Sequence, residues 1–333
     1  MEKVKLGVIG LGSIAQLIHI PNIVKQNNIV LSAVSEVKKN RLNLIAEKFS
    51  IQNRYTDYRQ MLEEQELDAV IIATPTNTHK EIAINCLSAG KDVLVEKPLA
   101  RTYAEAKEIV DAAKKHKKIL MVGMNLRYRP DTMLLRSIIN SSEIGDPFYV
   151  KCGWIRSQSS LEKWFTQKDI AGGGVIIDLG IHLLDLALWS MSFPEVSSVS
   201  CKNFYHQNKE VEDTSISFIK FKDGSLVNIE VSWTLITSKD SFYLNVFGTK
   251  GSASLSPLHV VKKIDNEIID LLPSQSENPT TLFKKSYVNE LKSFIGAVLG
   301  LNPVISPGED ALKRLKIIEA MYQSSIKNKE IEL

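Results

Sequence analysis

Cysteine is scarce in this 333-residue sequence, which contains only three. Cys86, Cys152 and Cys201 lie far apart, without a C-x-x-C pair, so they predict neither a disulfide framework nor a zinc site. We expect reduced core thiols, no bound metal, and a reducing compartment, the cytoplasm.

A long apolar run is also missing. The best candidate, residues 175–191, is interrupted by Asp178, His182 and Asp185, whereas a membrane span needs about 18 to 20 apolar residues. The first five residues lead directly into a strand-like pattern, which leaves no room for a signal peptide. We therefore expect no association with a membrane.

Neither sign of charge is in excess, because 41 basic and 38 acidic residues give a net charge of +3. This balance argues against nucleic acid as a partner. With 44% hydrophobic and 24% charged residues the composition is that of a soluble globular protein, and a chain of this length usually divides into two cores. We expect two domains and a small-molecule substrate.

The first third of the chain alternates apolar strands with amphipathic helices. This rhythm predicts a doubly wound parallel sheet with right-handed crossovers, in which ligands bind beyond the carboxyl ends of the strands. The expected strands are 4–9, 30–34, 69–73, 92–95 and 119–122; the expected helices begin after Gly12 and cover 41–49, 80–89 and 103–116.

After Gly123 the pattern changes to consecutive strands. Asp223-Gly224 between two alternating runs predicts a hairpin. We expect an α+β domain with an open, largely antiparallel sheet, so the fold class is α/β with domains at 1–123 and 124–333. The expected helices are 130–140, 287–299 and 309–326, and the expected strands are 148–155, 196–204, 215–222, 225–234 and 241–248.

A glycine-rich turn follows the first strand. Gly10, Gly12 and Ala15 give G-x-G-x-x-A at the start of a helix, with Ser13 and Ile14 between. The first glycine allows the tight turn, the second lets a pyrophosphate approach the backbone, and the helix N-terminus favours the phosphates. The motif predicts dinucleotide binding.

An acidic residue, Glu36, follows the second strand, 24 residues beyond Gly12. A carboxylate there accepts a hydrogen bond from a ribose 2′-hydroxyl and repels a 2′-phosphate, which favours NAD. NADP remains open, because Lys38, Lys39 and Arg41 nearby are suited to a phosphate.

Two further strands end in polar residues. Beyond the third, the cofactor should meet Thr74, Pro75, Asn77 and His79, with capping of the next helix by Thr78 as the alternative. The fourth ends in Glu96-Lys97-Pro98, which aims a lysine at the same crevice.

The segment from Gly172 to Trp189 is the most informative one. Asp178, His182 and Asp185 are spaced i, i+4 and i+7, so on a helix they form one stripe in an otherwise apolar surface. Burying such a stripe is costly unless it is paired or faces a wet cleft. We expect a site at Asp178 and His182, with a core histidine as the alternative, and a structural role for Asp185.

Together these motifs resemble the Gfo/Idh/MocA family of nicotinamide-dependent oxidoreductases, named for glucose-fructose oxidoreductase and inositol dehydrogenase. The resemblance spans nearly the whole chain, up to the helix start at Ser306-Pro307-Gly308. It implies a Rossmann domain that binds NAD through the residues above, Glu96 and Lys97 included. It also implies a C-terminal domain whose sheet makes a homodimer or homotetramer.

By this resemblance, Lys97, Asp178 and His182 are the catalytic residues of hydride transfer between a secondary alcohol and nicotinamide. An imidazole, with an unperturbed pKa of about 6.5, suits the base that takes the hydroxyl proton. Lys97 would stabilise charge on the oxygen and Asp178 would orient the hydroxyl or the imidazole.

Substrate recognition is expected from the second domain, on a sugar, cyclitol or sugar derivative. A uronate or nucleotide-sugar is open, because arginines bind carboxylate and phosphate. The alternative function is a non-catalytic NAD(P)-binding sensor of the same fold. The candidate substrate residues are Asn125, Arg127, Tyr128, Trp154, Arg156 and Trp164.

Overall fold

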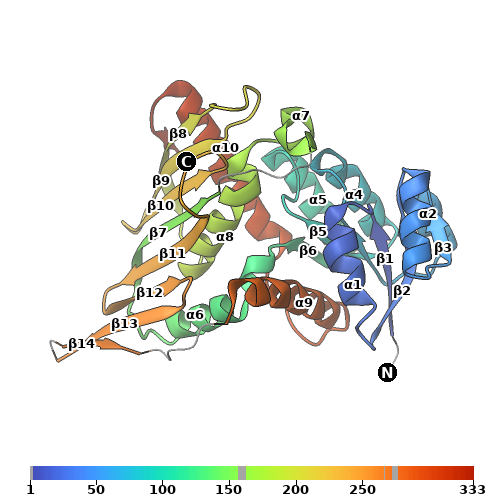
Figure 1. The fold of residues 1–333 in the computed structure, drawn as a ribbon, viewed down its shortest axis with the longest axis horizontal. Coiled ribbons are helices and arrows are strands. Elements are labelled where there is room, and N and C mark those ends of the chain that lie inside the picture. Colours follow the sequence, from blue (N-terminus) through green and yellow to red (C-terminus); the bar gives the residue numbers. More distant parts are fainter. Residues whose placement is uncertain (1–2, 157–162, 266, 272–276) are drawn as a thin grey trace. The chain divides into compact units, whose positions relative to one another are not determined.

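The computed structural model describes residues 3–156, 163–265, 267–271 and 277–333 (Figure 1). Met1 and Glu2, expected just before the first strand, lie outside this range. The chain separates into two compact units, 1–125 with 287–312 and 126–286 with 313–333. The sequence predicts a single division after residue 123, whereas the first unit extends to residue 125 and also includes residues 287–312.

The first unit contains a six-stranded parallel sheet in the order β3-β2-β1-β4-β5-β6. This order reverses direction between β1 and β4, where dinucleotides bind in doubly wound folds. The doubly wound sheet predicted from the sequence is confirmed. Its strands are β1 (Val4–Ile9), β2 (Ile29–Ser35), β3 (Asn53–Tyr55), β4 (Ala69–Ile72), β5 (Asp92–Glu96) and β6 (Leu120–Gly123).

The strands of this sheet are buried because helices cover them. β4 is buried along its whole length, as its unbroken apolar run predicts. The helix α5 begins where the Thr102 hydroxyl accepts a hydrogen bond from the Glu105 N–H, and it ends at Lys117 in the left-handed conformation. The helical segments are η1 (Ala15–His19), α1 (Ile20–Ile23), α2 (Lys39–Lys48), α3 (Tyr58–Glu64), η2 (Thr76–Thr78), α4 (His79–Ser88) and α5 (Tyr103–His116). The short turn η3 (Asn125–Tyr128) begins at residue 125 and belongs mostly to the second unit.

The late segment 287–312 is held to β6 by hydrogen bonds. The Val122 N–H donates to the Ser306 carbonyl at 2.9 Å, and the Ser306 hydroxyl donates to the Val122 carbonyl at 2.7 Å. Pro307 forms a bridge with Met121. These contacts satisfy the edge of the sheet, and this is why the segment belongs to the first unit.

The second unit contains a nine-stranded sheet in the order β14-β13-β12-β11-β7-β10-β9-β8-β15. Its strands pair antiparallel except β7 with β10, which run parallel. The predicted hairpin joins β9 and β10, with Gly224 at a φ of +86°. Its strands are β7 (Pro147–Ile155), β8 (Val196–Phe204), β9 (Thr214–Phe221), β10 (Leu226–Ser232), β11 (Ser241–Gly248), β12 (Gly251–Leu255), β13 (His259–Ile264), β14 (Glu267–Asp270) and β15 (Ile331–Glu332).

The central helix of the second unit, α8, packs on β7, β10 and β11 and is buried except at Trp189 (Figure 1). Among the described residues, one helical stretch, residues 168–190, is long and apolar enough to cross a membrane, but 83% of its apolar window is buried within the protein. It is therefore a core element. The helical segments are α6 (Pro130–Asn140), η4 (Lys163–Thr166), α7 (Lys168–Ala171), η5 (Ile176–Gly180) and α8 (Ile181–Ser190); α9 (Pro279–Val298) and α10 (Gly308–Lys327) each contribute to both units.

Candidate active site

The glycine-rich turn after β1 lies against the end of β4. Gly10 has a φ of +89°, and a Cβ there would lie 2.6 Å from the Ala73 carbonyl oxygen, so no other residue fits without movement. A Cβ on Gly12 would meet only that same oxygen, at 4.0 Å. The space beside Gly12 is therefore open, as a pyrophosphate approaching the backbone requires, and the turn fits a dinucleotide.

Glu36 is buried at the carboxyl end of β2 and binds the glycine-rich turn. Its Oε2 accepts the Leu11 N–H at 3.1 Å, and its Oε1 accepts the Lys38 N–H at 2.9 Å. Arg41, one of the candidate phosphate ligands, lies 3.3 Å from Oε2. The structure thus places a carboxylate beside the turn, where the sequence predicts the 2′-hydroxyl contact.

The polar loop after β4 leaves Thr74, Pro75 and Asn77 partly or fully exposed, and His79 buried at the start of α4. The His79 ring lies 2.9 Å from both the Pro98 and the Thr74 carbonyl oxygens, and burial lowers its pKa. His79 therefore joins this loop to the end of β5, and its contact with the cofactor stays a prediction. Thr78 does not cap α4, because its hydroxyl donates to the Pro75 carbonyl oxygen and is hydrogen-bonded to the Thr74 hydroxyl.

The end of β5 carries Glu96 and Lys97. Glu96 Oε1 accepts a hydrogen bond from His19 Nε2 at 2.7 Å, and Oε2 accepts the Lys97 N–H at 3.3 Å. His19 lies on η1, immediately after the glycine-rich turn. The sequence analysis missed His19, because a lone histidine in a short helix gives no signal.

In the second unit, Asp178 lies on the π-helical turn η5 and His182 follows on α8. Asp178 Oδ2 accepts a hydrogen bond from Trp233 Nε1 at 3.2 Å, and the His182 ring lies 6.0 Å from the Trp154 ring. Trp154 is the next-to-last residue of β7 and Trp233 directly follows β10. Because these two strands are parallel, their carboxyl ends meet at one edge. The structure therefore gathers an acid, an imidazole and two indoles; Trp233 was not predicted.

A buried carboxylate, Glu212, fixes the start of η5. It accepts the N–H groups of Gly174 and Ile176, each at 3.0 Å, and the Tyr322 hydroxyl at 2.9 Å. Burial raises the pKa of Glu212 despite these donors. Sequence reasoning missed this contact, because Glu212 and Tyr322 lie far from the helix in the chain.

Asp185 has the structural role that its position predicted. Its carboxylate is bidentate to Arg127, at 2.8 and 2.6 Å, and it also accepts from Arg314. Arg127 has no exposed surface and lies over the Trp189 and Phe193 rings. Arg127 is therefore a core residue, whereas we had expected it to contact substrate.

The remaining substrate candidates divide by burial. Asn125 and Tyr128 are buried, and Trp164 stacks on Phe165 with ring centroids 4.0 Å apart. Trp154 and Arg156 are half-buried, and Arg156 lies 3.6 Å from Asp240. Among these candidates, Trp154 is the residue whose ring contacts the His182 ring.

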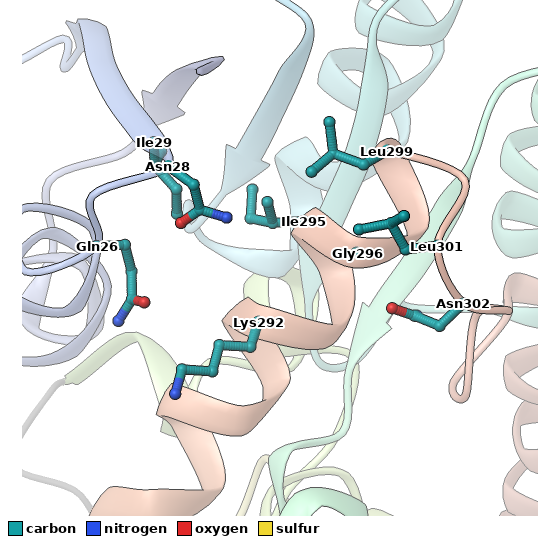
Figure 2. A pocket seen from close by; sticks show the side chains of 9 residues that line it. All are labelled: Gln26, Asn28, Ile29, Lys292, Ile295, Gly296, Leu299, Leu301 and Asn302. Carbon is teal, nitrogen blue, oxygen red and sulfur yellow. The ribbon is translucent and has the colours of Figure 1, made fainter. Parts of the chain in front are cut away.

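A cavity of about 320 Å³ lies elsewhere in the first unit (Figure 2). It opens beside the start of β2 and the end of α9, at the amino edge of the sheet, whereas the glycine-rich turn is at the carboxyl edge. This cavity is thus remote from the candidate cofactor site. Its lining is Gln26, Asn28, Ile29, Lys292, Ile295, Gly296, Leu299, Leu301 and Asn302.

Two family models match the chain. Residues 4–124 match an oxidoreductase family with an NAD-binding Rossmann fold, and residues 132–254 match the GFO/IDH/MocA C-terminal domain. The chain belongs to the Gfo/Idh/MocA family. It is an oxidoreductase that uses NAD, and the resemblance and the α/β fold expected from the sequence are confirmed.

Known relatives match over nearly the full length. The chain is 27% identical to the D-glucoside 3-dehydrogenase of Escherichia coli (strain K12), over 99% of this chain and 97% of that protein. It is 30% identical to the scyllo-inositol 2-dehydrogenase (NAD(+)) of Bacillus subtilis (strain 168), over 92% and 89%. A solved structure of levoglucosan dehydrogenase with NADH and L-sorbose has the same fold, with a TM-score of 0.89 at 22% identity, covering 100% of this chain and 99% of that one.

Proposed function

We propose that the protein is an NAD-dependent dehydrogenase that oxidises a secondary hydroxyl of a sugar, cyclitol or sugar derivative. The observation that carries this proposal is the pairing of Asp178 with Trp233 and of His182 with Trp154, in a chain of this family. The full-length similarity to a glucoside and an inositol dehydrogenase supports the substrate class.

The cofactor would be held at the carboxyl edge of the parallel sheet. Gly12, Ser13 and Ile14 would receive the pyrophosphate, and Glu36 would accept the ribose 2′-hydroxyl. The exposed Pro75 and Asn77, the partly exposed Thr74 and the end of β5 would complete the site. When bound, NAD supplies the nicotinamide carbon that accepts the hydride.

Three side chains of this chain then handle the substrate hydroxyl. His182 takes its proton as general base, since a neutral imidazole suits that role near neutral pH. Lys97 stabilises the negative charge that develops on the oxygen. Asp178, which is itself held by Trp233, orients the hydroxyl or the imidazole. The Trp154 face offers an apolar surface to the carbon-bound hydrogens of a ring.

The test is reduction of NAD, followed as NADH absorbance, with a panel of sugars, inositols, uronates and nucleotide-sugars. We expect at least one of them to be oxidised. If NAD bound tightly and no compound on the panel were oxidised, the alternative function, a non-catalytic NAD(P)-binding sensor of the same fold, would be favoured.

Variants test the assigned roles. Lys97→Ala and His182→Ala should each lower kcat at least about 10²-fold while NAD still binds, since general acid–base groups typically contribute 10²- to 10⁴-fold. Lys115→Ala and His206→Ala, at exposed positions, are the matched controls and should keep full activity. Activity that survives in both site variants would rule out these roles.

We further propose that the protein acts in the cytoplasm as a homo-oligomer. On the solvent-exposed face of the second sheet, β9 carries the apolar side chains of Ile216 and Phe218, which are 41% and 45% exposed. β9 alternates regularly between buried and exposed residues, so these two side chains lie on one face. A second copy of the chain on this face would remove them from water.

A further inference from the structure

Three ionisable side chains interact in the interior of the first unit, two through a hydrogen bond and the third through its charge. His19 comes from η1, Glu96 from the end of β5, and Glu290 from α9. His19 and Glu290 are 4% and 1% exposed. His19 Nε2 donates to Glu96 Oε1 at 2.7 Å, a short charge-assisted hydrogen bond between two nearly buried groups. The cluster joins the helix after the glycine-rich turn to the strand end that carries Lys97.

The Glu96 carboxylate is confined from the other side as well. β6 pairs with β5 so that Gly123 lies opposite Glu96, and a Cβ on Gly123 would be 3.2 Å from Glu96 Oε2. The same Oε2 accepts the Lys97 N–H. Any movement of the carboxylate is therefore passed to the peptide group that begins Lys97.

Glu290 is the unusual member of the cluster. Its Oε1 has no hydrogen-bond partner among the described residues, and burial, followed by the charge of Glu96, raises its pKa well above the ordinary value. Leaving a buried polar atom unpaired costs free energy, and a leucine or methionine would fill the space without that cost. A metal does not explain the acid, because the described part of the chain holds no group of three or more His, Cys, Asp or Glu side chains arranged for one.

We propose that His19 and Glu290 are positioning residues for the reaction, which act through the Glu96 carboxylate on the strand end that carries Lys97. His19 holds the carboxylate by its ring N–H, and Glu290 is a buried acid whose neutral form is favoured by burial and by the charge of Glu96, which raise its pKa. The titratable groups around Glu96 are then His19, Glu290, the buried His79 and Lys97. The proposal rests on the proposed dehydrogenase function for its kinetic readout.

The first test compares His19→Leu with His19→Gln. Leucine removes the donor to Glu96, whereas the glutamine amide restores an N–H at a similar reach. His19→Leu should lower kcat about 10²-fold, with KM and the Kd for NAD changed by less than about threefold, because small displacements of a catalytic group cost about that much. His19→Gln should recover to within about tenfold of wild type. His116→Leu, on the end of α5, is the control and should leave kcat unchanged.

The second test is the pH profile of Glu290→Gln, which keeps a neutral side chain of the same shape. The wild-type kcat should show an ionisation that is missing from Glu290→Gln, with equal kcat at the acid end of the range. Identical profiles would overturn the role of Glu290. Equal losses in His19→Gln and His19→Leu, with unchanged profiles, would reduce His19 to a structural residue and overturn its role.

A measurement without substrate separates this proposal from the proposed function. Lysines are methylated with ¹³C, and the Lys97 signal is assigned from Lys97→Arg. In wild type and His19→Leu bound to NAD, the Lys97 signal should appear at different chemical shifts, because its surroundings differ. If no alcohol on the panel is oxidised but the signal moves, the dehydrogenase proposal fails and the positioning stands. An unmoved signal overturns the positioning, whatever the activity.

Discussion

Gly10 and Gly12 are two residues apart in the same turn and are constrained for different reasons. Gly10 adopts a positive φ and approaches the Ala73 carbonyl so closely that a side chain has no room. Gly12 has ordinary space around it, and what a side chain would block is a ligand. One glycine therefore serves the fold and the other serves binding.

Alanine at each position tests this difference. The Tm of Gly12→Ala should lie within about 2 °C of the wild-type Tm, while NAD should bind at least about tenfold more weakly. Gly10→Ala should lose NAD binding, and its Tm should also fall by several degrees, because a strained backbone and a collision with the backbone both destabilise the fold. Scanning fluorimetry and NAD titration measure the two effects. Tight NAD binding by Gly12→Ala would contradict this assignment.

Glu36 is the residue that should set the cofactor preference. Glu36→Ser removes the carboxylate that repels a 2′-phosphate and frees Arg41 to bind one. The ratio of kcat/KM for NAD to that for NADP should fall about 10²-fold. Adding Arg41→Ala to Glu36→Ser should reverse the gain in kcat/KM for NADP. If Glu36→Ser alone kept the wild-type ratio, this would argue against the predicted 2′-hydroxyl contact.

Glu290 should also influence stability in a pH-dependent manner. Its pKa is raised in the folded protein, so its neutral form stabilises the fold at low pH, and that contribution is lost as the pH rises through the raised pKa. The Tm of Glu290→Gln relative to wild type should therefore increase from pH 5 to pH 9. Glu63→Gln, at an exposed site, is the control, and a constant difference for Glu290→Gln would show that the acid does not titrate in this range.

At the scale of an element, the important feature is the π-helical turn η5 before α8. Its first N–H groups are satisfied by Glu212, and Gly174 allows that contact, because a Cβ there would lie 2.1 Å from the Glu212 carbonyl oxygen. Asp178 lies on this turn, and His182 is the second residue of the regular helix. The wide turn therefore sets the position of Asp178 relative to His182.

Two glycines of this segment make a matched pair. Gly174→Ala should destabilise the protein by about 3 kcal/mol, since overpacking against backbone cannot be relieved by a rotamer change. Gly180→Ala meets its nearest atoms at 3.6 Å, an ordinary contact, and should be neutral or slightly stabilising. Denaturant unfolding of both variants measures this difference, and equal values would show that Glu212 does not confine the turn.

Regular elements could be predicted from the sequence, and their exceptions could not. The parallel strands and α5 follow from apolar runs and capping residues, which are local signals. The π-helical turns η1 and η5 add a residue to a turn without changing composition, so the i, i+4, i+7 spacing gave no warning of them. Arg127 was misassigned because its partners Asp185 and Arg314 are distant in the chain, and charge alone does not distinguish a buried ion pair from a binding site.

At the scale of the whole molecule, the first unit is completed by a late segment of the chain. A fragment of residues 1–125 would leave the Val122 N–H and the edge of β6 without their partners on Ser306. We expect that fragment to be insoluble, whereas residues 1–125 joined to 287–312 by a flexible linker should fold and bind NAD. Circular dichroism and NAD titration distinguish the two, and a soluble, NAD-binding 1–125 would contradict this view.

The proposed assembly is tested at the same scale. Phe218→Lys with Ile216→Lys places two charges on the exposed face of β9 and should convert the oligomer to a smaller species in light scattering. Lys115→Glu, on the first unit, is the control for a change of surface charge. An unchanged mass in the double variant would place the interface elsewhere.

The chain passes between its two units after residues 125, 286 and 312. A genetic exchange that replaced the whole second unit would therefore need three breakpoints, and a single crossover near residue 125 would also replace the segment that closes β6. New substrate preferences in this lineage are thus expected to arise by point substitution within 126–286, while the cofactor half and its late segment are inherited together.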